Sequence, residues 1–332
     1  MEKYNVYGIG NALVDIEFEV EEQFFKKNDI EKGIMTLVDE ERQTKLVKAI
    51  DGERIKKQGG GSAANTMIGL SQFGGNGFYS CKVANDDYGQ FYMNDLSKAG
   101  LDTNLNQDNL EDGITGKCLV MVTPDADRTM NTFLGITATL DSSAIDEDAI
   151  KNADYVYIEG YLITSDNGKE AMKQTKALAE KHGVKTSITL SDPAIVNFFK
   201  AGFEEVIGEG VDLLFCNEDE AMQYTGTDNL LEAREKLKFI AKRFAITLGK
   251  NGAMIFDGDT FIDIESYKVN AIDSNGAGDM FAGAFLYGIT NGHGYADAGK
   301  IASLAASKIV AKFGPRLEDG QAKEILKSVV VS

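Results

Sequence analysis

Residues 153–192 read ADYVYIEGYLITSDNGKEAMKQTKALAEKHGVKTSITLSD, and this stretch indicates the architecture of the chain. The apolar run 153–162 predicts a buried strand, residues 168–183 predict a helix that ends at glycine, and residues 184–192 predict a second strand. Two apolar strands joined by a helix are typical of a parallel β-α-β unit, because a parallel pair needs a long crossover. We therefore expect a parallel sheet in this region.

The same alternation continues toward the C-terminus. Strands are expected at residues 211–217 and 245–249, and helices at 218–226, 230–244, 276–290 and 295–314. Strands that alternate with helices in this way predict an α/β fold of three layers (αβα), with a mostly parallel central sheet covered by helices on both faces.

The N-terminal part of the chain has a different pattern. Its short apolar runs, and two strands expected at 114–122 and 128–134, lack intervening helices. We expect these regions, roughly 12–39 and 108–138, to form a small β lid that projects from the main sheet. No linker, repeat or low-complexity tract divides the chain, so residues 1–332 are expected to form a single domain with this lid.

Composition excludes several classes of function. The net charge is −18, which is unsuitable for binding nucleic acid or an anionic membrane, although a local positive potential would still allow ATP to bind. No stretch approaches the roughly 18 apolar residues that a membrane span needs, and the N-terminus does not resemble a signal peptide. The three cysteines are far apart and read as reduced, buried thiols, so we expect a cytoplasmic protein. Two histidines are too few for a histidine-rich metal site.

The strongest functional motif is IDSNGAGDMFAGAFLYG, residues 272–288. Gly276, Ala277 and Gly278 are small, so their N–H groups can converge at the start of the following helix and form an anion site suited to a phosphate in transfer. Asp279 in the first turn is placed to take a proton from an attacking hydroxyl group. The motif alone is equally consistent with an ordinary helix start that carries a dipole-favoured acid.

A second glycine motif makes a family recognisable. DSNGAGDMFAGAF resembles the C-terminal signature of the ribokinase-like (PfkB) carbohydrate and nucleoside kinases, usually D-T-x-G-A-G-D, with Ser274 in place of the threonine. QGGGSAANTMIGLSQFGG, residues 58–75, resembles their N-terminal signature. The resemblance covers essentially the whole chain. It implies a ribokinase-like fold, ATP with Mg²⁺ as cofactor, and Asp279 as general base.

The start of the chain resembles adenosine kinases within that family. In GIGNALVDI, residues 8–16, the match puts Asn11 and Asp15 at the ribose, where the Asp15 carboxylate would accept hydrogen bonds from the 2′- and 3′-hydroxyl groups. Gly60 and Gly61 would let the backbone approach the sugar, and Asn65 would reach its hydroxyls. A solvated turn residue is the alternative for Asp15, and an ordinary helical amide the alternative for Asn65.

Other matches concern the phosphates and the base. DADRTMNTFLG resembles a lid hairpin and implies that Arg128 reaches the transferring phosphate, unless it is a solvated arginine. CNEDEA resembles an N-x-x-E element, so Asn217 and Glu220 are expected to place Mg²⁺ through water, unless they only begin an acidic helix. Tyr161 matches an aromatic residue against the purine, but Ala194 replaces a second one. Residues implied on the ATP side are Thr247, Gly249, Gly252 and Asn275.

The resemblance implies phosphorylation of a nucleoside 5′-hydroxyl, with adenosine and ATP giving AMP and ADP in purine salvage. A ribokinase, a fructokinase, another nucleoside kinase or a catalytically silent ligand-binding protein stay open as alternatives. A P-loop is rejected, because Ile301 stands where GHGYADAGKI would need a hydroxyl residue, and a dinucleotide site in YGIGNAL lacks its third glycine. The sequence does not decide the exact acceptor, monomer against dimer, or a need for a monovalent cation.

Overall fold

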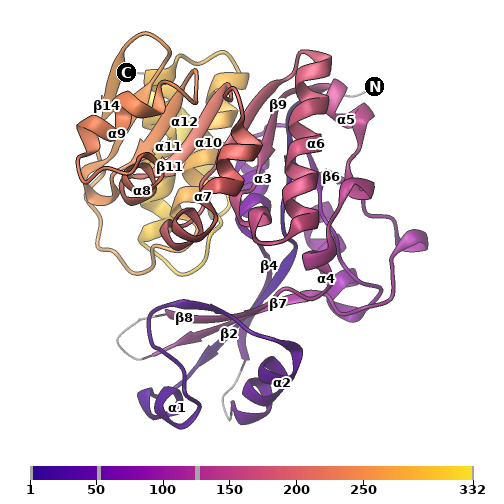
Figure 1. Cartoon of the computed structure of the whole chain (residues 1–332). Helices are drawn as coiled ribbons and strands as arrows, with labels where there is room; N and C mark the ends of the chain where they lie inside the picture. The colour runs from indigo at the N-terminus through magenta and orange to yellow at the C-terminus, as the bar shows by residue number, and fades with distance from the viewer. Residues whose placement is uncertain (1–2, 51–53, 124–127, 331–332) are drawn as a thin grey trace.

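The computed structural model describes residues 3–50, 54–123 and 128–330, and it contains two separate sheets (Figure 1). The larger sheet has nine strands in the order β14-β13-β12-β11-β10-β9-β1-β5-β6. The smaller sheet has five strands in the order β3-β8-β7-β2-β4. In Figure 1 the smaller sheet projects from one side of the body.

The nine-stranded sheet is mostly parallel. Every neighbouring pair from β6 to β12 is parallel, and only β13 and β14 are added antiparallel at one edge. The carboxyl ends of the parallel strands therefore meet at one edge of the sheet, where ligands bind in open α/β folds. The strands are β1 (Tyr4–Ile9), β5 (Gly77–Ser80), β6 (Asp102–Thr103), β9 (Ala153–Ile158), β10 (Lys185–Thr189), β11 (Leu213–Asn217), β12 (Phe244–Thr247), β13 (Ala253–Phe256) and β14 (Phe261–Ile264).

Helices cover both faces of this sheet, so the expected three-layer αβα fold is confirmed. Each face has its own hydrophobic core. One core is formed with α3 (Ser62–Gln72), α4 (Asp87–Lys98), α10 (Ala277–Thr290), α11 (Tyr295–Val310) and α12 (Gln321–Val330). The other is formed with α5 (Glu147–Lys151), α6 (Asp166–His182), α7 (Pro193–Ile207), α8 (Glu218–Thr225) and α9 (Leu230–Leu237). Short 3-10 helices are η1 (Gln107–Asn109), η2 (Gly135–Thr139), η3 (Ser142–Ala144), η4 (Gly160–Thr164) and η5 (Gly249–Asn251).

Two expected helices are shorter than the sequence indicates. The helix expected over 230–244 ends at Leu237, because the chain must turn there to bring Val211 beside Ala241 and to start β12. The helix expected over 295–314 ends at Val310. Helix α7 was not expected, although Asp192 caps it and Pro193 occupies its first turn, which together are a helix start signal.

The five-stranded sheet contains β2 (Leu13–Glu19), β3 (Met35–Leu37), β4 (Arg54–Gly60), β7 (Gly116–Val122) and β8 (Arg128–Phe133), with α1 (Glu22–Lys27) and α2 (Glu40–Ala49) beside it. The expected antiparallel pair of strands is found in β7 and β8. Strand β4 is an addition to the expected lid regions, since RIKKQGG lacks the alternation of a half-buried strand. We call this unit the lid sheet, and its movement as a lid is a proposal.

Membrane-spanning helices are not found in the described ranges, where no helix combines the necessary length and apolarity.

Helices α3 and α10, which begin at the two glycine motifs, pack closely against each other. A Cβ atom at Gly283 of α10 would lie 2.3 Å from the Thr66 carbonyl oxygen and 2.9 Å from the Leu70 nitrogen, both backbone atoms of α3. A Cβ atom at Gly69 of α3 would make only ordinary contacts, with the Met280 side chain at 3.4 Å and the Gly283 Cα at 3.8 Å. The spacing of the two helices therefore depends on Gly283.

We expect Gly283→Ala to lower the free energy of unfolding by about 1–3 kcal/mol, because the added methyl group must push two backbones apart. Gly69→Ala is the matched control in the same interface. Alanine is favoured over glycine in a helix by up to about 1 kcal/mol, so this variant should be neutral or stabilising. Denaturant unfolding measures both, and equal effects would contradict the packing argument.

Candidate active site

Asp279 lies in the first turn of α10, directly after a glycine turn. Gly276 precedes the helix with φ of 76°, and a Cβ atom there would lie 2.3 Å from the Cβ of Pro315, so only glycine fits. Gly278 has open space at its Cβ position. Ala277 already donates its N–H to the Ser274 carbonyl at 3.2 Å, which leaves the later amides of the turn as the better anion donors. We call residues 273–278 the second glycine turn.

The Asp279 carboxylate is held by two side chains of α3. The Ser62 hydroxyl donates to Oδ1 at 2.6 Å, and the Asn65 amide donates to Oδ2 at 3.2 Å. Burial raises the pKa of Asp279 to about 6, and these two hydrogen bonds offset part of that effect. A carboxyl group with a pKa near neutrality is suited to act as a general base.

The polar atoms of Asn65 are not all satisfied. Its side chain is buried, and within the described ranges its Oδ1 atom has no hydrogen-bond partner. A buried acceptor without a partner is costly, so this atom is a candidate to accept a hydrogen bond from a ligand hydroxyl group.

Asn11, which follows β1, is fixed by a buried carboxylate, Glu159, at the end of β9. The Asn11 amide donates to Glu159 Oε1 at 2.7 Å, and Ala63 N–H at the start of α3 donates to Oε2 at 2.8 Å. Glu159 is 1% exposed, and burial raises its pKa to about 7, with a further contribution from the negative charge of Asp279. Glu159 therefore connects the end of the first strand with the start of α3, the helix whose side chains bind the Asp279 carboxylate.

Sequence reasoning missed Glu159 and Ser62. Glu159 interrupts the apolar run YVYIEGYLI just where the strand ends, and an ionisable residue in such a position was a usable signal. Ser62 had no comparable signal, because its role depends on the packing of α3 against α10.

Asp15 and residues 59–61, which we call the first glycine turn, lie together. Asp15 in β2 pairs with Gln58 in β4, and a Cβ atom at Gly60 would lie 2.3 Å from Asp15 Oδ2. Gly61 has φ of 101°, and a Cβ atom there would lie 2.3 Å from the Asn11 carbonyl oxygen. The structure therefore brings together the five residues expected around an acceptor: Asn11, Asp15, Gly60, Gly61 and Asn65.

Asn217 and Glu220 form a capping box at the start of α8. Asn217 Oδ1 accepts from the Glu220 N–H at 2.8 Å, while the Glu220 carboxylate accepts from the N–H and the side-chain amide of Asn217 at 3.0 and 2.8 Å. Burial raises the pKa of Glu220 to about 7, and the charges of Asp192 and Asp219 add to this. The expected pair is thus a helix cap in a region of concentrated negative charge.

These residues fit Mg²⁺ through water rather than as direct ligands. Their oxygen atoms are of the kind that Mg²⁺ prefers, and a cation would relieve the repulsion among the carboxylates. In the part of the chain that the structure describes, no three His, Cys, Asp or Glu side chains are grouped to hold a metal by themselves.

The residues expected on the ATP side lie on two segments, the turn after β12 and the second glycine turn. Thr247 ends β12 opposite Asn217 in β11, and the turn after it contains Gly249 and Gly252. Gly252 has φ of 92°, and a Cβ atom there would lie 2.0 Å from the Ile264 carbonyl oxygen. Asn275 belongs to the second glycine turn and donates its N–H to Asp273 at 3.0 Å.

Tyr161 lies in η4, after β9, at the same edge of the sheet. Burial raises its pKa, and so do the negative charges of Asp192, Asp279, Glu159 and Glu220, which shows that these carboxylates lie around it. The backbone of Arg128 begins β8 opposite Val122, but its side chain lies outside the described part, so its expected contact with phosphate is not tested.

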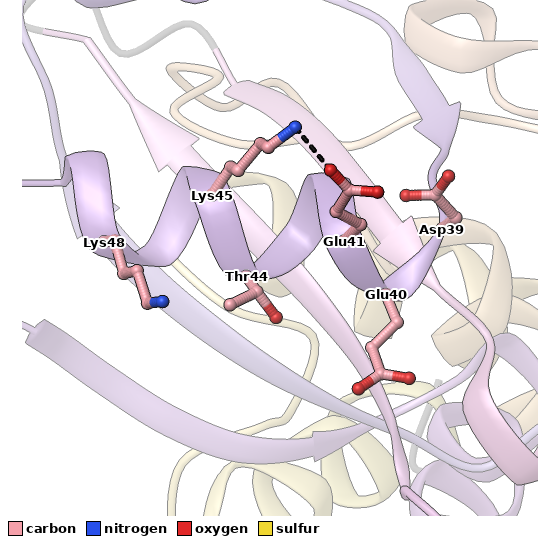
Figure 2. A pocket seen from close by; sticks show the side chains of 6 residues that line it. All are labelled: Asp39, Glu40, Glu41, Thr44, Lys45 and Lys48. Carbon is pink, nitrogen blue, oxygen red and sulfur yellow. Dashed lines mark ion pairs between the residues drawn. The ribbon is translucent and has the colours of Figure 1, made fainter.

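A surface hollow lies elsewhere, on helix α2 beside the lid sheet (Figure 2). Its lining is charged and contains the Glu41–Lys45 ion pair at 2.6 Å. None of the residues discussed above lines it, so it is unrelated to the Asp279 site. The lining residues are Asp39, Glu40, Glu41, Thr44, Lys45 and Lys48.

Comparison with known proteins finds similarity to carbohydrate and adenosine kinases. A family model described as pfkB family carbohydrate kinase matches residues 33–319. The structure resembles a probable sugar kinase from Rhizobium etli, with 33% identity, a TM-score of 0.91 and all of both chains covered. It also resembles the adenosine kinase of Sinorhizobium meliloti, with 31% identity, a TM-score of 0.90, and 98% of this chain and 100% of the other covered. A ribokinase of Staphylococcus aureus is 30% identical over 271 residues, which are 79% of this chain and 85% of the relative.

Glu159 generates a prediction about pH. Its pKa is about 7 in the folded protein against an ordinary value of 4.5, so the folded state binds the proton more tightly. The stability that this group contributes is fully present below about pH 4.5 and is lost as the pH rises through about 7. The free energy of unfolding of the wild type, relative to Glu159→Gln, should therefore fall by on the order of 3 kcal/mol from pH 4.5 to pH 8.

Urea unfolding at several pH values measures this difference. Glu235→Gln, on an exposed part of α9, is the control and should not change the slope. A constant difference between wild type and Glu159→Gln across the range would show that Glu159 is not protonated on folding.

Proposed function

Since this chain belongs to the pfkB family of carbohydrate kinases, we propose that its acceptor is a nucleoside, adenosine, which it phosphorylates on the 5′-hydroxyl. The chain is an ATP-dependent phosphotransferase with an alcohol acceptor, as its family membership establishes. The proposed reaction is adenosine and ATP to AMP and ADP, a step of purine salvage.

The observation that carries the proposal is the position of Asp279 between two sets of groups. On one side are the amides of the second glycine turn, which favour an anion. On the other side is Asn65, which bonds the Asp279 carboxylate and lies next to the residues around the first glycine turn. A carboxylate between these two sets of groups is suited to take the proton of the acceptor hydroxyl while that oxygen bonds to the phosphoryl group.

In the proposed mechanism the acceptor is oriented before transfer. The Asp15 carboxylate accepts hydrogen bonds from the 2′- and 3′-hydroxyl groups, and Asn65 Oδ1, which lacks a partner within the described residues, accepts another hydroxyl. Gly60 and Gly61 let the sugar approach the backbone, and Asn11 borders it. Fixing the acceptor in this way removes much of the entropic cost of bringing two substrates together.

Asp279 takes the proton of the 5′-hydroxyl as its oxygen bonds to the γ-phosphorus of ATP. The bond between that phosphorus and the β,γ-bridging oxygen breaks, and ADP leaves. The amide of Gly278 and the Arg128 guanidinium stabilise the negative charge of the group in transfer, while Gly276 and Ala277 shape the turn. In this scheme the lid sheet closes over the acceptor and excludes water.

ATP is proposed to lie along the carboxyl edge of the sheet, bordered by Thr247, Gly249, Gly252 and Asn275. Mg²⁺, held through water by Asn217 and Glu220, would neutralise phosphate charge when bound. The raised pKa of Glu220 supports this assignment, because a cation would favour its ionised form.

Comparison alone does not separate adenosine from a free sugar, because the Rhizobium etli probable sugar kinase and the Sinorhizobium meliloti adenosine kinase are almost equally similar to this chain. Adenosine is preferred because of a residue in the site. Tyr161 supplies an aromatic ring at the edge where a purine would be needed. A sugar is the second candidate, because Glu159 and Asn11 make one wall of the acceptor region polar and buried.

We expect Asp279→Asn to lower kcat by roughly 10²–10⁴-fold, the usual effect of losing a general base. In the wild type, kcat/KM should fall about tenfold per pH unit below pH 6, where the carboxylate becomes protonated. Asp297→Asn is the control, since Asp297 is also an acid in a first helical turn, that of α11. Turnover by Asp279→Asn within threefold of wild type would remove Asp279 from the mechanism.

An ADP-release assay with adenosine, inosine, cytidine, ribose and fructose tests the acceptor. We expect kcat/KM for adenosine to exceed that for ribose by at least tenfold. A higher value for ribose or fructose would replace the nucleoside with a sugar and leave the phosphotransfer intact.

A further inference from the structure

The first glycine turn begins with a glycine, Gly59, that has no part in the proposed chemistry. Its backbone is held by an ion pair between Arg316, near the C-terminus, and Asp95 of α4. Arg316 donates to the Gly59 carbonyl oxygen at 2.7 Å and to Asp95 Oδ1 at 3.0 Å. The Asp95 carboxylate in turn accepts the Gly59 N–H at 3.2 Å. The N–H and the carbonyl group of Gly59 are therefore both hydrogen-bonded to the Arg316–Asp95 ion pair.

This ion pair explains why residue 59 is glycine. A Cβ atom there would lie 2.4 Å from Asp95 Oδ2 and 3.3 Å from an Arg316 nitrogen, so any side chain would displace the pair. The next residue is held in a related way, because the Tyr92 hydroxyl of α4 donates to the Gly60 carbonyl oxygen at 2.9 Å. The end of β4, where the lid sheet joins the body in Figure 1, is thus anchored on α4 and Arg316.

The segment that carries Arg316 also contacts the second glycine turn. Gly314 donates its N–H to Asp273 Oδ2 at 3.3 Å. Pro315 lies against Gly276, at the position where a Cβ atom would be only 2.3 Å away. We call residues 314–317 the brace, because three consecutive residues of it contact first one glycine turn and then the other.

The brace is itself fixed on α3. Gln72 donates from its side chain to the Leu317 carbonyl oxygen at 2.8 Å and accepts the Leu317 N–H at 3.0 Å. The brace therefore connects two turns that are more than 200 residues apart in the sequence, and Gln72 fixes the position of the brace.

Stability alone is a weak explanation for this ion pair. The side chains of Arg316 and Asp95 are 23% and 17% exposed, and burying opposite charges costs desolvation energy that their attraction only partly returns. The Nε of Arg316 is also buried without a partner among the described residues. A guanidinium group does, however, fix geometry, since its planar fork bonds two oxygens at once.

We propose that Arg316, paired with Asp95, is a positioning residue that sets the separation between the two glycine turns, and hence between acceptor and ATP. Each turn is completed by other residues, so each substrate still binds alone when Arg316 is replaced. The reaction between the two substrates, in contrast, needs the correct separation, and a displacement of about 1 Å can cost about 10²-fold in rate. This inference rests on the proposed transfer of a phosphoryl group, but it does not require the acceptor to be adenosine.

The test compares Arg316→Met, Arg316→Lys and Asp95→Asn with Lys242→Met, which breaks an ion pair with Asp212 (2.8 Å) away from both turns. For Arg316→Met we expect kcat to fall about 10–100-fold, while the Kd values for adenosine and for the Mg²⁺ complex of a non-hydrolysable ATP analogue, each measured alone by calorimetry, stay within about threefold of wild type. Arg316→Lys keeps the charge without the fork, so it should recover part of the rate. Lys242→Met should leave kcat unchanged.

Two results would overturn the proposal: a kcat within twofold of wild type in Arg316→Met, or a lower kcat accompanied by a tenfold weaker Kd for the acceptor, which would limit Arg316 to shaping one turn. If Arg316→Met does not fold, the same criteria apply to Arg316→Lys and Asp95→Asn. If the wild type prefers another acceptor of the panel, that acceptor replaces adenosine in every measurement, so an error in the proposed acceptor is distinguishable from an error here.

Discussion

The hydrogen bonds from Ser62 and Asn65 to Asp279 join two helix starts that are more than 210 residues apart. They form only because α3 and α10 approach closely enough for Gly283 to touch the backbone of α3. In the proposed mechanism, the same approach puts Asn65 on the acceptor side and the second glycine turn on the phosphate side. The two glycine motifs are therefore one structural unit, built on a single helix pair.

Negative charge is concentrated at the carboxyl edge of the sheet, around this helix pair. Burial raises the pKa values of Asp279, Glu159 and Glu220, and the charge of Asp279 adds to the effect on Glu159. In the proposed mechanism, the Mg²⁺ that accompanies ATP reduces the repulsion between these carboxylates and the polyanionic cosubstrate. The burial that raises the pKa of Asp279 also concentrates this repulsion, so one physical cause, removal of water, would serve both the proposed acid–base chemistry and the need for a cation.

Much of the fold could be predicted because its patterns are local. The β-α-β alternation of residues 153–217 and the helix start at Asp279 are visible within windows of about 15 residues. Strand β4 was missed because RIKKQGG has no apolar alternation, and α9 was extended too far because pairing between Val211 and Ala241 is a tertiary constraint. In the site, Asp279 and its glycine turn could be argued from the residues themselves, and the other motif residues could be named because their motifs resemble those of the kinase family. Ser62 and Arg316 could not, because each bonds a partner more than 200 positions away, and the charge of Glu159 within an apolar run indicated a special position without indicating its partners.

The position of Tyr161 has a consequence for how acceptor choice can change. The glycine turns are enclosed by Asp15, Asp95 and Pro315, so that almost any substitution there disturbs the transfer machinery. Tyr161 instead belongs to a five-residue 3-10 segment, and Ala194 is exposed at the start of α7. Evolution, or a designer, could therefore exchange these two short segments to accommodate a different base or a bare sugar while the catalytic frame stays intact.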